Sequence, residues 1–303
     1  MNIEKWLSAN TSSLVGKTVA ISGSTGGIGQ ELCFYLARLG ASLVLVDRDP
    51  VKSGALQKRL TESYPDLSVK GILADMSRPA SVAEATERLK ELPIDVFIIN
   101  AGAYSIPRCV CDSGYDNVFQ INFVSPYYMV RGLLDGLRRR HGKVVVVGSV
   151  AHRYSVSDRD DVDFSTREKA SLVYGNSKRY LMFTLIKLFE NEKDVSLAIT
   201  HPGITFTNIT SHYPPLIFAL IKRPMKIIFP PPRVACLSIL RGVFEDTHGT
   251  EWIGPCLFDV WGAPKRRALR SVRAEELEYF GEWNNNSNIH VRKAGSDAEE
   301  SLS

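Results

Sequence analysis

The chain has 303 residues, of which 44% are hydrophobic and 23% are charged, and its formal net charge at pH 7 is +4. This composition is typical of a soluble globular protein and excludes wholesale disorder and fibrous structure. The charge is too small to indicate a nucleic-acid partner, and no apolar run approaches the roughly 18 residues of a membrane-spanning helix. Because the N-terminus also lacks the apolar core of a secretory signal, we expect a cytoplasmic location.

Predicted strands and helices alternate from residue 17 to about residue 200. The strands are expected at 17–22, 42–46, 68–74, 95–99, 143–147 and 195–200, and the helices at 27–39, 51–63, 79–92, about 113–139 and about 172–191. The strands are apolar throughout, which is typical of strands buried on both faces. We therefore predict an α/β fold, a Rossmann-type doubly wound parallel sheet in a single domain over residues 1–283.

The C-terminal third has a different character. Residues 214–232 are apolar and rich in proline, whereas residues 284–303 are polar and are predicted to form a disordered tail. Between them lies a basic stretch, predicted to be the solvated face of a helix, with Lys265, Arg266, Arg267, Arg270 and Arg273. The five cysteines are an odd number in a chain without a secretory signal, and no metal site is expected.

The first strand runs directly into the glycine-rich sequence SGSTGGIG, and a helix follows at once. Glycine lets backbone N–H groups and a helix N-terminus approach a pyrophosphate, because a Cβ would block the approach. The sequence thus predicts a dinucleotide site, with an ordinary tight turn as the alternative. Its candidate residues are Gly23, Ser24, Thr25, Gly27, Ile28 and Gly29.

The choice between NAD and NADP depends on the end of the second strand. Asp47 lies 18 residues after Gly29, where an acidic side chain binds the adenosine ribose and repels a 2′-phosphate. This favours NAD, although the adjacent Arg48 suits the 2′-phosphate of NADP. Asp75, with Met76 beside it, ends the third strand and is placed to reach the adenine, or else to cap the following helix.

Further motifs follow in order: INAG at 99–102, Asn122, Ser149, YGNSK at 174–178, and HPG at 201–203 with Thr207. Together with the glycine turn they resemble the short-chain dehydrogenase/reductase family, and the insert at 151–172 resembles its retinol-dehydrogenase-like branch, which often uses NADP. The resemblance implies oxidation of an alcohol or reduction of a carbonyl. It implies catalytic roles for Asn122, Ser149, Tyr174 and Lys178, and cofactor contacts from Asn100, Ala101, Gly102, Tyr174, Lys178, Pro202, Gly203 and Thr207.

The chemistry of these residues supports the resemblance. Tyr174 and Lys178 are four residues apart and share one face of a helix, so the ammonium is expected to lower the pKa of the phenol. Tyr174 would then act as general acid or base, and the Ser149 hydroxyl would hold the substrate oxygen. Pro126 removes the N–H that would bond the Asn122 carbonyl, and in the family that carbonyl holds a water linked to the lysine.

Two other functions have to be weighed against an alcohol or carbonyl oxidoreductase. One is a nucleotide-binding scaffold or sensor without turnover, which the intact set of four catalytic residues disfavours. The other is a sugar-nucleotide epimerase, which shares the Tyr–Lys pair but usually has another glycine spacing and a larger C-terminal domain.

Residues 204–232 follow the segment that touches the nicotinamide in the family, and we expect them to form a substrate lid. Their apolar residues suit a hydrophobic alcohol or ketone, and 214–229 also suit a peripheral membrane contact. An ordinary packed lid or a contact in a homo-oligomer are the alternatives. The apolar residues are Leu216, Ile217, Phe218, Leu220, Ile221, Ile227, Ile228 and Phe229.

Overall fold

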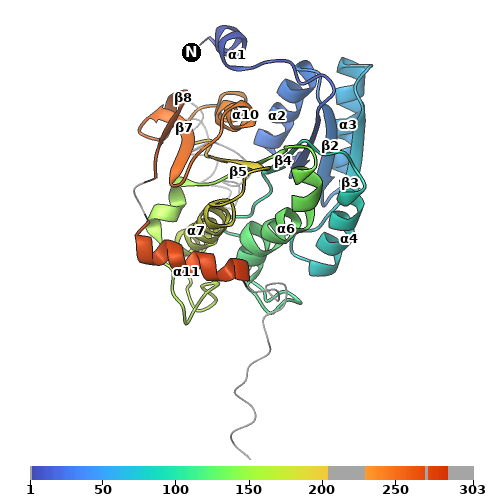
Figure 1. Cartoon of the computed structure of the whole chain (residues 1–303). Coiled ribbons are helices and arrows are strands. Elements are labelled where there is room, and N and C mark those ends of the chain that lie inside the picture. The colour runs from blue at the N-terminus through green and yellow to red at the C-terminus, as the bar shows by residue number, and fades with distance from the viewer. Residues whose placement is uncertain (1, 204–228, 270–271, 286–303) are drawn as a thin grey trace, which may run out of the picture.

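The computed structural model describes residues 2–203, 229–269 and 272–285 (Figure 1). Most of the expected lid at 204–232 lies outside the described residues, as do Thr207 and the tail from residue 286 onward. The helices and strands named below therefore come from the described ranges.

Eight strands form one sheet in the order β3-β2-β1-β4-β5-β6-β7-β8. Neighbouring strands from β3 to β7 are parallel, and β8 pairs antiparallel with β7 at the edge. This arrangement confirms the predicted doubly wound α/β fold. The strands are β1 (Thr18–Ser22), β2 (Ser42–Asp47), β3 (Val69–Leu73), β4 (Val96–Ile99), β5 (Lys143–Val147), β6 (Ser196–Thr200), β7 (Glu251–Leu257) and β8 (Trp261–Ala268).

Helices cover both faces of the sheet (Figure 1). One face carries α4 (Pro79–Lys90), α6 (Ser125–Arg138) and α7 (Ala170–Leu188), and the other carries α2 (Gly27–Arg38), α3 (Pro50–Ser63) and α10 (Leu237–Phe244). Shorter elements are α1 (Ile3–Asn10), α9 (Pro232–Ala235) and a 3₁₀ turn, η2 (Val150–Tyr154). Among the described helices, none is long and apolar enough to cross a bilayer.

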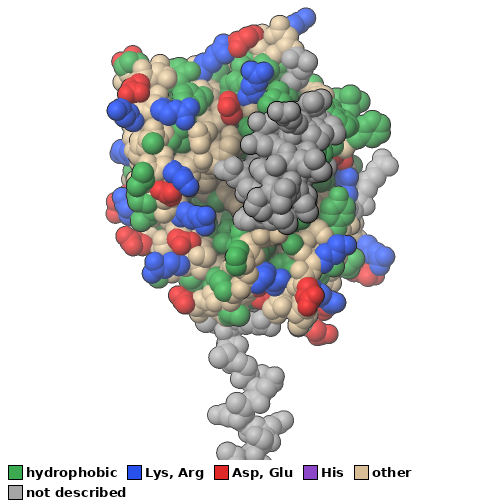
Figure 2. All heavy atoms as spheres, turned by 180° about the vertical axis from the view of Figure 1, so that it is seen from behind, with side chains coloured by type: hydrophobic (Ala, Val, Ile, Leu, Met, Phe, Trp, Pro, Cys, Tyr) green, Lys and Arg blue, Asp and Glu red, His purple; other side chains and the backbone are tan. Residues whose placement is uncertain are grey.

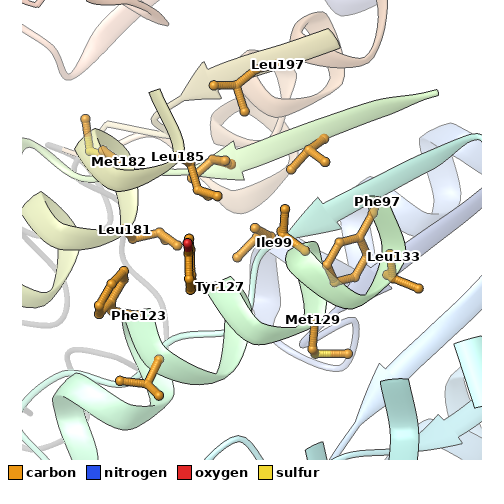
Figure 3. Close-up of a cluster of buried hydrophobic side chains, with 14 of the residues drawn as sticks. Phe97, Ile99, Phe123, Tyr127, Met129, Leu133, Leu181, Met182, Leu185 and Leu197 are labelled. Atoms are coloured by element: carbon orange, nitrogen blue, oxygen red, sulfur yellow. The ribbon is translucent and has the colours of Figure 1, made fainter. Parts of the chain in front are cut away.

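The larger core cluster fills the space between the sheet and α6 and α7 (Figure 3). Ile99 of β4 faces Tyr127 of α6 and Leu181 of α7 there, whereas Phe97 of β4 lies beside Leu133 of α6, and all five side chains are buried. Because close-packed interiors allow little movement, these buried side chains fix the position of α7, which carries the Tyr–Lys pair, relative to β4 and β5.

The helix expected at about 113–139 runs from 117 to 138, but it is not uniform. A short α5 (Asn117–Phe119) is followed by a π-helical turn, η1 (Gln120–Val124), which leads into α6. The Ser125 N–H bonds the Gln120 carbonyl, five residues back, just before Pro126. Because proline supplies no N–H, the wider turn is a local solution to the bond that Pro126 removes.

Two predictions for the C-terminal part are wrong. Lys265, Arg266 and Arg267 lie in β8 and not on a helix, and their charges lie on the edge strand of the sheet, where they discourage pairing with another chain. Helix α11 (Ala274–Asn285) extends two residues into the expected tail. Its Asn284 accepts a hydrogen bond from the Tyr127 hydroxyl at 2.7 Å, which anchors the end of the helix.

Helix α11 packs across α7 (Figure 1). The ring of its buried Phe280 has its centroid 4.9 Å from that of Tyr180 and 5.6 Å from that of Phe183. We expect Phe280→Ala to lower the free energy of unfolding by about 3–5 kcal/mol, because it leaves a cavity among these rings. The control is Glu275→Ala at an exposed position of the same helix, with an expected change within about 0.5 kcal/mol. Equal losses in urea titrations of the two variants would contradict this packing.

Candidate active site

The predicted site residues lie at the carboxyl ends of neighbouring parallel strands. Gly23 follows β1, Asn100 follows β4, and Ser149 comes two residues after the end of β5. In a doubly wound sheet this edge is where ligands bind. The pairing of the strands thus brings together residues that are up to 126 positions apart in the sequence.

The glycine turn has the close packing that requires glycine. Gly23 has a φ of +68°, and a Cβ on it would lie 2.8 Å from the Ala101 Cα. A Cβ on Gly29 would lie 2.4 Å from the Gly23 carbonyl oxygen. Helix α2 begins at Gly27, and no side chain caps its first turn. The N–H groups around Gly27 and Ile28 therefore suit a phosphate, and the cradle fits a dinucleotide.

Asp47 is buried, and its carboxylate is occupied by the protein itself. It accepts hydrogen bonds from the Ser24 hydroxyl at 2.5 Å and the Ser53 hydroxyl at 3.2 Å, and from the Thr25 N–H and hydroxyl, both at 3.1 Å. Four donors fill the roughly four acceptor positions of a carboxylate. Asp47 thus ties the glycine turn to β2 and α3, a role that the sequence did not reveal. Arg48 is exposed and has no ion-pair partner among the described residues.

Asp75 lies in the turn before α4. Its Oδ1 accepts hydrogen bonds from the Ser77 N–H at 2.9 Å and the Ser77 hydroxyl at 2.7 Å. These hydrogen bonds are local to the turn, and no side chain caps the first turn of α4, so Asp75 does not cap this helix as the alternative supposed. Met76 is buried, and its carbonyl accepts a hydrogen bond from the Ser125 hydroxyl at 2.6 Å. A contact of Asp75 or Met76 with adenine stays a prediction.

The INAG segment is held against the glycine turn by Ser22, which we did not identify from the sequence. The Ser22 hydroxyl accepts hydrogen bonds from the Asn100 and Ala101 N–H groups, both at 3.1 Å. The Asn100 side-chain amide donates to the Ser22 and Gly23 carbonyls at 3.0 and 2.8 Å. The ends of β1 and β4 are therefore locked together. A serine directly before the first glycine was the available signal.

Asn122 clamps the chain beyond INAG through its side chain. Its Oδ1 accepts the Ala103 N–H at 2.9 Å, and its Nδ2 donates to the Ala103 carbonyl at 2.8 Å. A Cβ on Gly102 would lie 2.8 Å from the Asn122 Oδ1 and 3.5 Å from the Lys178 Nζ. Gly102, Asn122 and Lys178 are thus brought together, and a larger residue at position 102 would separate them.

Lys178 is a buried cation with an incomplete set of partners. Its Nζ donates to the Val147 carbonyl at 3.0 Å, its one acceptor among the described residues, although an ammonium has three N–H donors. Burial lowers the pKa of Lys178 to about 8. The remaining donors suit ribose hydroxyls, so this residue also fits a dinucleotide.

Tyr174 hydrogen-bonds Ser149, and the edge of its ring packs against Tyr104, with the ring centroids 5.2 Å apart. The expected lowering of its pKa is wrong for this structure. Burial raises the pKa of Tyr174 to about 12, and the Ser149 hydrogen bond opposes that rise only in part. The Lys178 Nζ lies 5.9 Å from the centre of the Tyr174 ring and bonds a carbonyl instead of the phenol, which explains the difference.

The HPG segment begins directly after β6. Gly203 has a φ of +79°, and its N–H donates to the Nδ1 of the buried His201 at 3.2 Å. Pro202 lies between them at a half-buried position. The segment lies beside Ser149, because the Gly148 N–H donates to the Thr200 carbonyl at 2.7 Å.

A second group of residues, which we did not identify from the sequence, holds the backbone at Ser149. The His152 Nδ1 donates to the Ser149 carbonyl at 2.5 Å, and the buried Arg179 donates to the His152 carbonyl at 3.0 Å. Arg179 also pairs with Glu276 of α11. Arg179 directly follows Lys178, but no sequence pattern links it to a glutamate 97 residues away. In the described part of the chain, no cluster of three or more His, Cys, Asp or Glu side chains could hold a metal ion.

Comparison with known proteins agrees with this geometry. A family model described as short chain dehydrogenase matches residues 17–160. A candidate daunorubicin C-13 ketoreductase from Streptomyces sp. (strain C5) is 31% identical over 202 residues, which are 65% of this chain and 68% of that protein. Retinol dehydrogenase 14 of Homo sapiens is 30% identical over 217 residues, and the match spans 65% of this chain and 64% of that relative.

The fold is also found in solved structures. A short-chain dehydrogenase from Sphingobium yanoikuyae in complex with NADPH superposes with a TM-score of 0.57 and 24% identity. The superposition covers 75% of this chain and 84% of that structure. At this level of sequence identity the match shows that the two proteins share a fold.

The buried His152 makes the stability of the fold depend on pH. Burial lowers the pKa of its imidazole from 6.5 to about 4. Between these values the unfolded chain binds a proton that the folded chain does not, so the free energy of unfolding falls as the pH decreases below about 6.5. We expect His152 to account for a loss of about 2 kcal/mol between pH 7 and pH 5.

Urea titrations at the two pH values test this prediction. His152→Gln should show a smaller loss than the wild type, whereas His248→Gln, at an exposed position, should retain the full loss. The same loss in all three proteins would contradict a neutral, buried His152.

Proposed function

The chain belongs to the short-chain dehydrogenase family, and from this premise we propose that it interconverts an alcohol and its carbonyl compound, with Tyr174 as general acid/base. The observation that carries the proposal is the convergence of Tyr174, Ser149 and Lys178 at the strand edge that also carries the glycine turn. A nucleotide-binding scaffold without turnover is the alternative, but it would have no need for this arrangement.

The nicotinamide dinucleotide of this family supplies a hydride acceptor or donor and, when oxidised, a positive charge beside the phenol. The chain's own residues would handle the proton and the substrate. Ser149 would hold the substrate oxygen, and the Tyr174 hydroxyl would exchange a proton with it. Lys178, with its unused N–H donors, would hold the nicotinamide ribose.

A raised pKa suits the proposed role of Tyr174 in one direction. A phenol with a pKa of about 12 remains protonated at neutral pH and is ready to protonate a developing alkoxide. For alcohol oxidation its pKa has to fall, and positive charge brought in by the cofactor would lower it. Binding of the oxidised cofactor would therefore adjust the phenol for alcohol oxidation.

NAD is the proposed cofactor, and NADP is the second candidate. The buried negative charge of Asp47 at the end of β2 disfavours a 2′-phosphate there, although its oxygens already hold Ser24, Thr25 and Ser53. Arg48 is exposed and unpaired among the described residues, which is the observation that favours NADP. The NADPH complex of the Sphingobium enzyme supports a nicotinamide dinucleotide of either kind.

The substrate is proposed to be a hydrophobic alcohol or ketone of small-molecule size, such as a retinoid, a steroid or a long-chain carbonyl compound. Two observations support this class: the apolar sequence of 214–229, and names of relatives that refer to retinol and to a ketoreductase. A cytoplasmic location, peripheral membrane contact through 214–229 and a homo-oligomer belong to the same proposal. Turnover of a panel of alcohols and ketones with each cofactor, with and without liposomes, tests it.

We expect Tyr174→Phe to lower kcat by roughly 10²–10⁴-fold, because the variant keeps the ring but loses the proton. Its Kd for the cofactor should stay the same, since the glycine turn is untouched. The control is Tyr154→Phe, which removes a hydroxyl from an exposed tyrosine near Ser149 and should leave kcat unchanged. Equal kcat in wild type and Tyr174→Phe would exclude the role assigned to Tyr174.

Arg48→Ala separates the two cofactors. We expect it to weaken NADP binding by about tenfold, the effect of losing one charge-assisted hydrogen bond, and to leave NAD binding unchanged. The measurement is the Kd of each dinucleotide by calorimetry, with Arg59→Ala on α3 as an exposed control. A wild type with a much higher kcat/KM for NADP would show that Arg48, and not Asp47, decides the preference.

A further inference from the structure

Three buried rings are in contact behind the candidate site. Trp252 of β7 lies between two histidines that come from the segments on either side of the reacting groups. The His201 ring stacks on the indole, with centroids 3.8 Å apart and an angle of 27°, and the His152 ring meets it edge-on at 5.3 Å. All three side chains are almost completely buried. One indole thus fixes both the segment after β5 and the segment after β6.

His201 has a defined tautomer in this arrangement. Its Nδ1 accepts the Gly203 N–H at 3.2 Å, so the proton of the neutral ring is on Nε2. Nε2 lies 3.4 Å from the Asp259 Oδ1. The ring occupies space that β7 leaves open, because a Cβ on Gly254 would lie 1.8 Å from that nitrogen. The imidazole therefore has one position and one orientation.

Asp259 is itself held firmly in the turn between β7 and β8. Its carboxylate forms ion pairs with Arg153 at 2.8 Å and with Arg267. Phe258 and Asp259 both have positive φ, of 53° and 57°, in a region that non-glycine residues seldom occupy. Since Arg153 belongs to η2, the ion pairs also tie this turn to the segment that begins at Ser149.

The position of Gly203 makes this arrangement relevant to the proposed reaction. Gly203 lies at the carboxyl end of β6, beside β5 and Ser149, and therefore on the side of the site where the proposed reaction would exchange the hydride. The glycine turn after β1 lies three strands away from β6 in the sheet, where the phosphates of a dinucleotide would bind.

We propose that His201 is a positioning residue, which holds the Pro202–Gly203 turn against the nicotinamide half of the cofactor, with the Asp259 carboxylate facing its Nε2. The inference rests on the proposed function, because it requires a nicotinamide at this position. The β7–β8 turn would then help to position the active site through Asp259, although none of its residues reacts.

Two substitutions separate the contacts of His201. An asparagine side chain reaches the place of Nδ1 and can still accept the Gly203 N–H, whereas a glutamine reaches the place of Nε2 and faces Asp259. Both variants lose the ring that stacks on Trp252. A difference in cofactor binding or in amide exchange between the two variants therefore reports on the hydrogen bond to Gly203.

The first readout compares NADH with ADP-ribose, which lacks the nicotinamide; NADPH and the 2′-phosphorylated analogue replace them if the wild type prefers NADP. We expect His201→Gln to weaken NADH binding by about tenfold, to leave ADP-ribose binding unchanged, and to lower kcat. His201→Asn should bind both ligands within about twofold of the wild type. The control is Lys265→Ala, an exposed substitution on β8.

The second readout is hydrogen exchange at the Gly203 amide of the free protein, which needs no cofactor. Exchange should be faster in His201→Gln than in His201→Asn. Equal exchange in the two variants, or equal weakening of both ligands, would overturn the role of His201. Failure of the wild type to bind either nicotinamide dinucleotide would overturn the proposed function instead, and the exchange rates would still decide whether His201 holds Gly203.

Discussion

Parallel pairing of the central strands is the constraint on which the candidate site depends. Ile21 of β1 pairs with Ile98 of β4, Ile99 with Val146 of β5, and Val147 with Thr200 of β6. Because these strands run in the same direction and in close register, their following residues emerge at one edge. A shift of one strand by a single residue would turn its side chains to the opposite face and separate the candidate catalytic groups.

Burial of charged groups then gives this edge its rigidity. An unpaired charge in the interior is costly, so each buried charge has to be surrounded by partners. Asp47 satisfies that requirement with donors from the glycine turn, and Arg179 satisfies it with Glu276 and the His152 carbonyl. Lys178 is the exception, since two of its N–H donors have no acceptor among the described residues. The unused donors of Lys178 therefore mark the place where a ligand would supply what is missing.

The order of strands and helices up to β6 could be predicted from the sequence, because each buried strand is a continuous apolar run. Most of the site residues could be placed as well, since motifs at strand ends fall on one edge in this fold. The basic segment at 265–267 was misassigned because charged residues on an edge strand give no alternating pattern. The β7–β8 turn was missed because Phe258, unlike the aspartate that follows it, is not typical of a tight turn. The pKa of Tyr174 depends on how deeply the ring is buried and on where Lys178 points, and spacing alone contains neither.

The π-helical turn at Gln120–Val124 has a consequence for how this chain is compared with others. A π turn contains one residue more than an α turn, and each residue of an α-helix advances the side chains by about 100°. Loss of one residue here would leave a continuous helix but would rotate Asn122 relative to α6, away from Ala103. A single-residue gap at this point of an alignment therefore indicates that the π turn is lost. Homologues that differ by this gap have to be aligned on the asparagine and not on the helix.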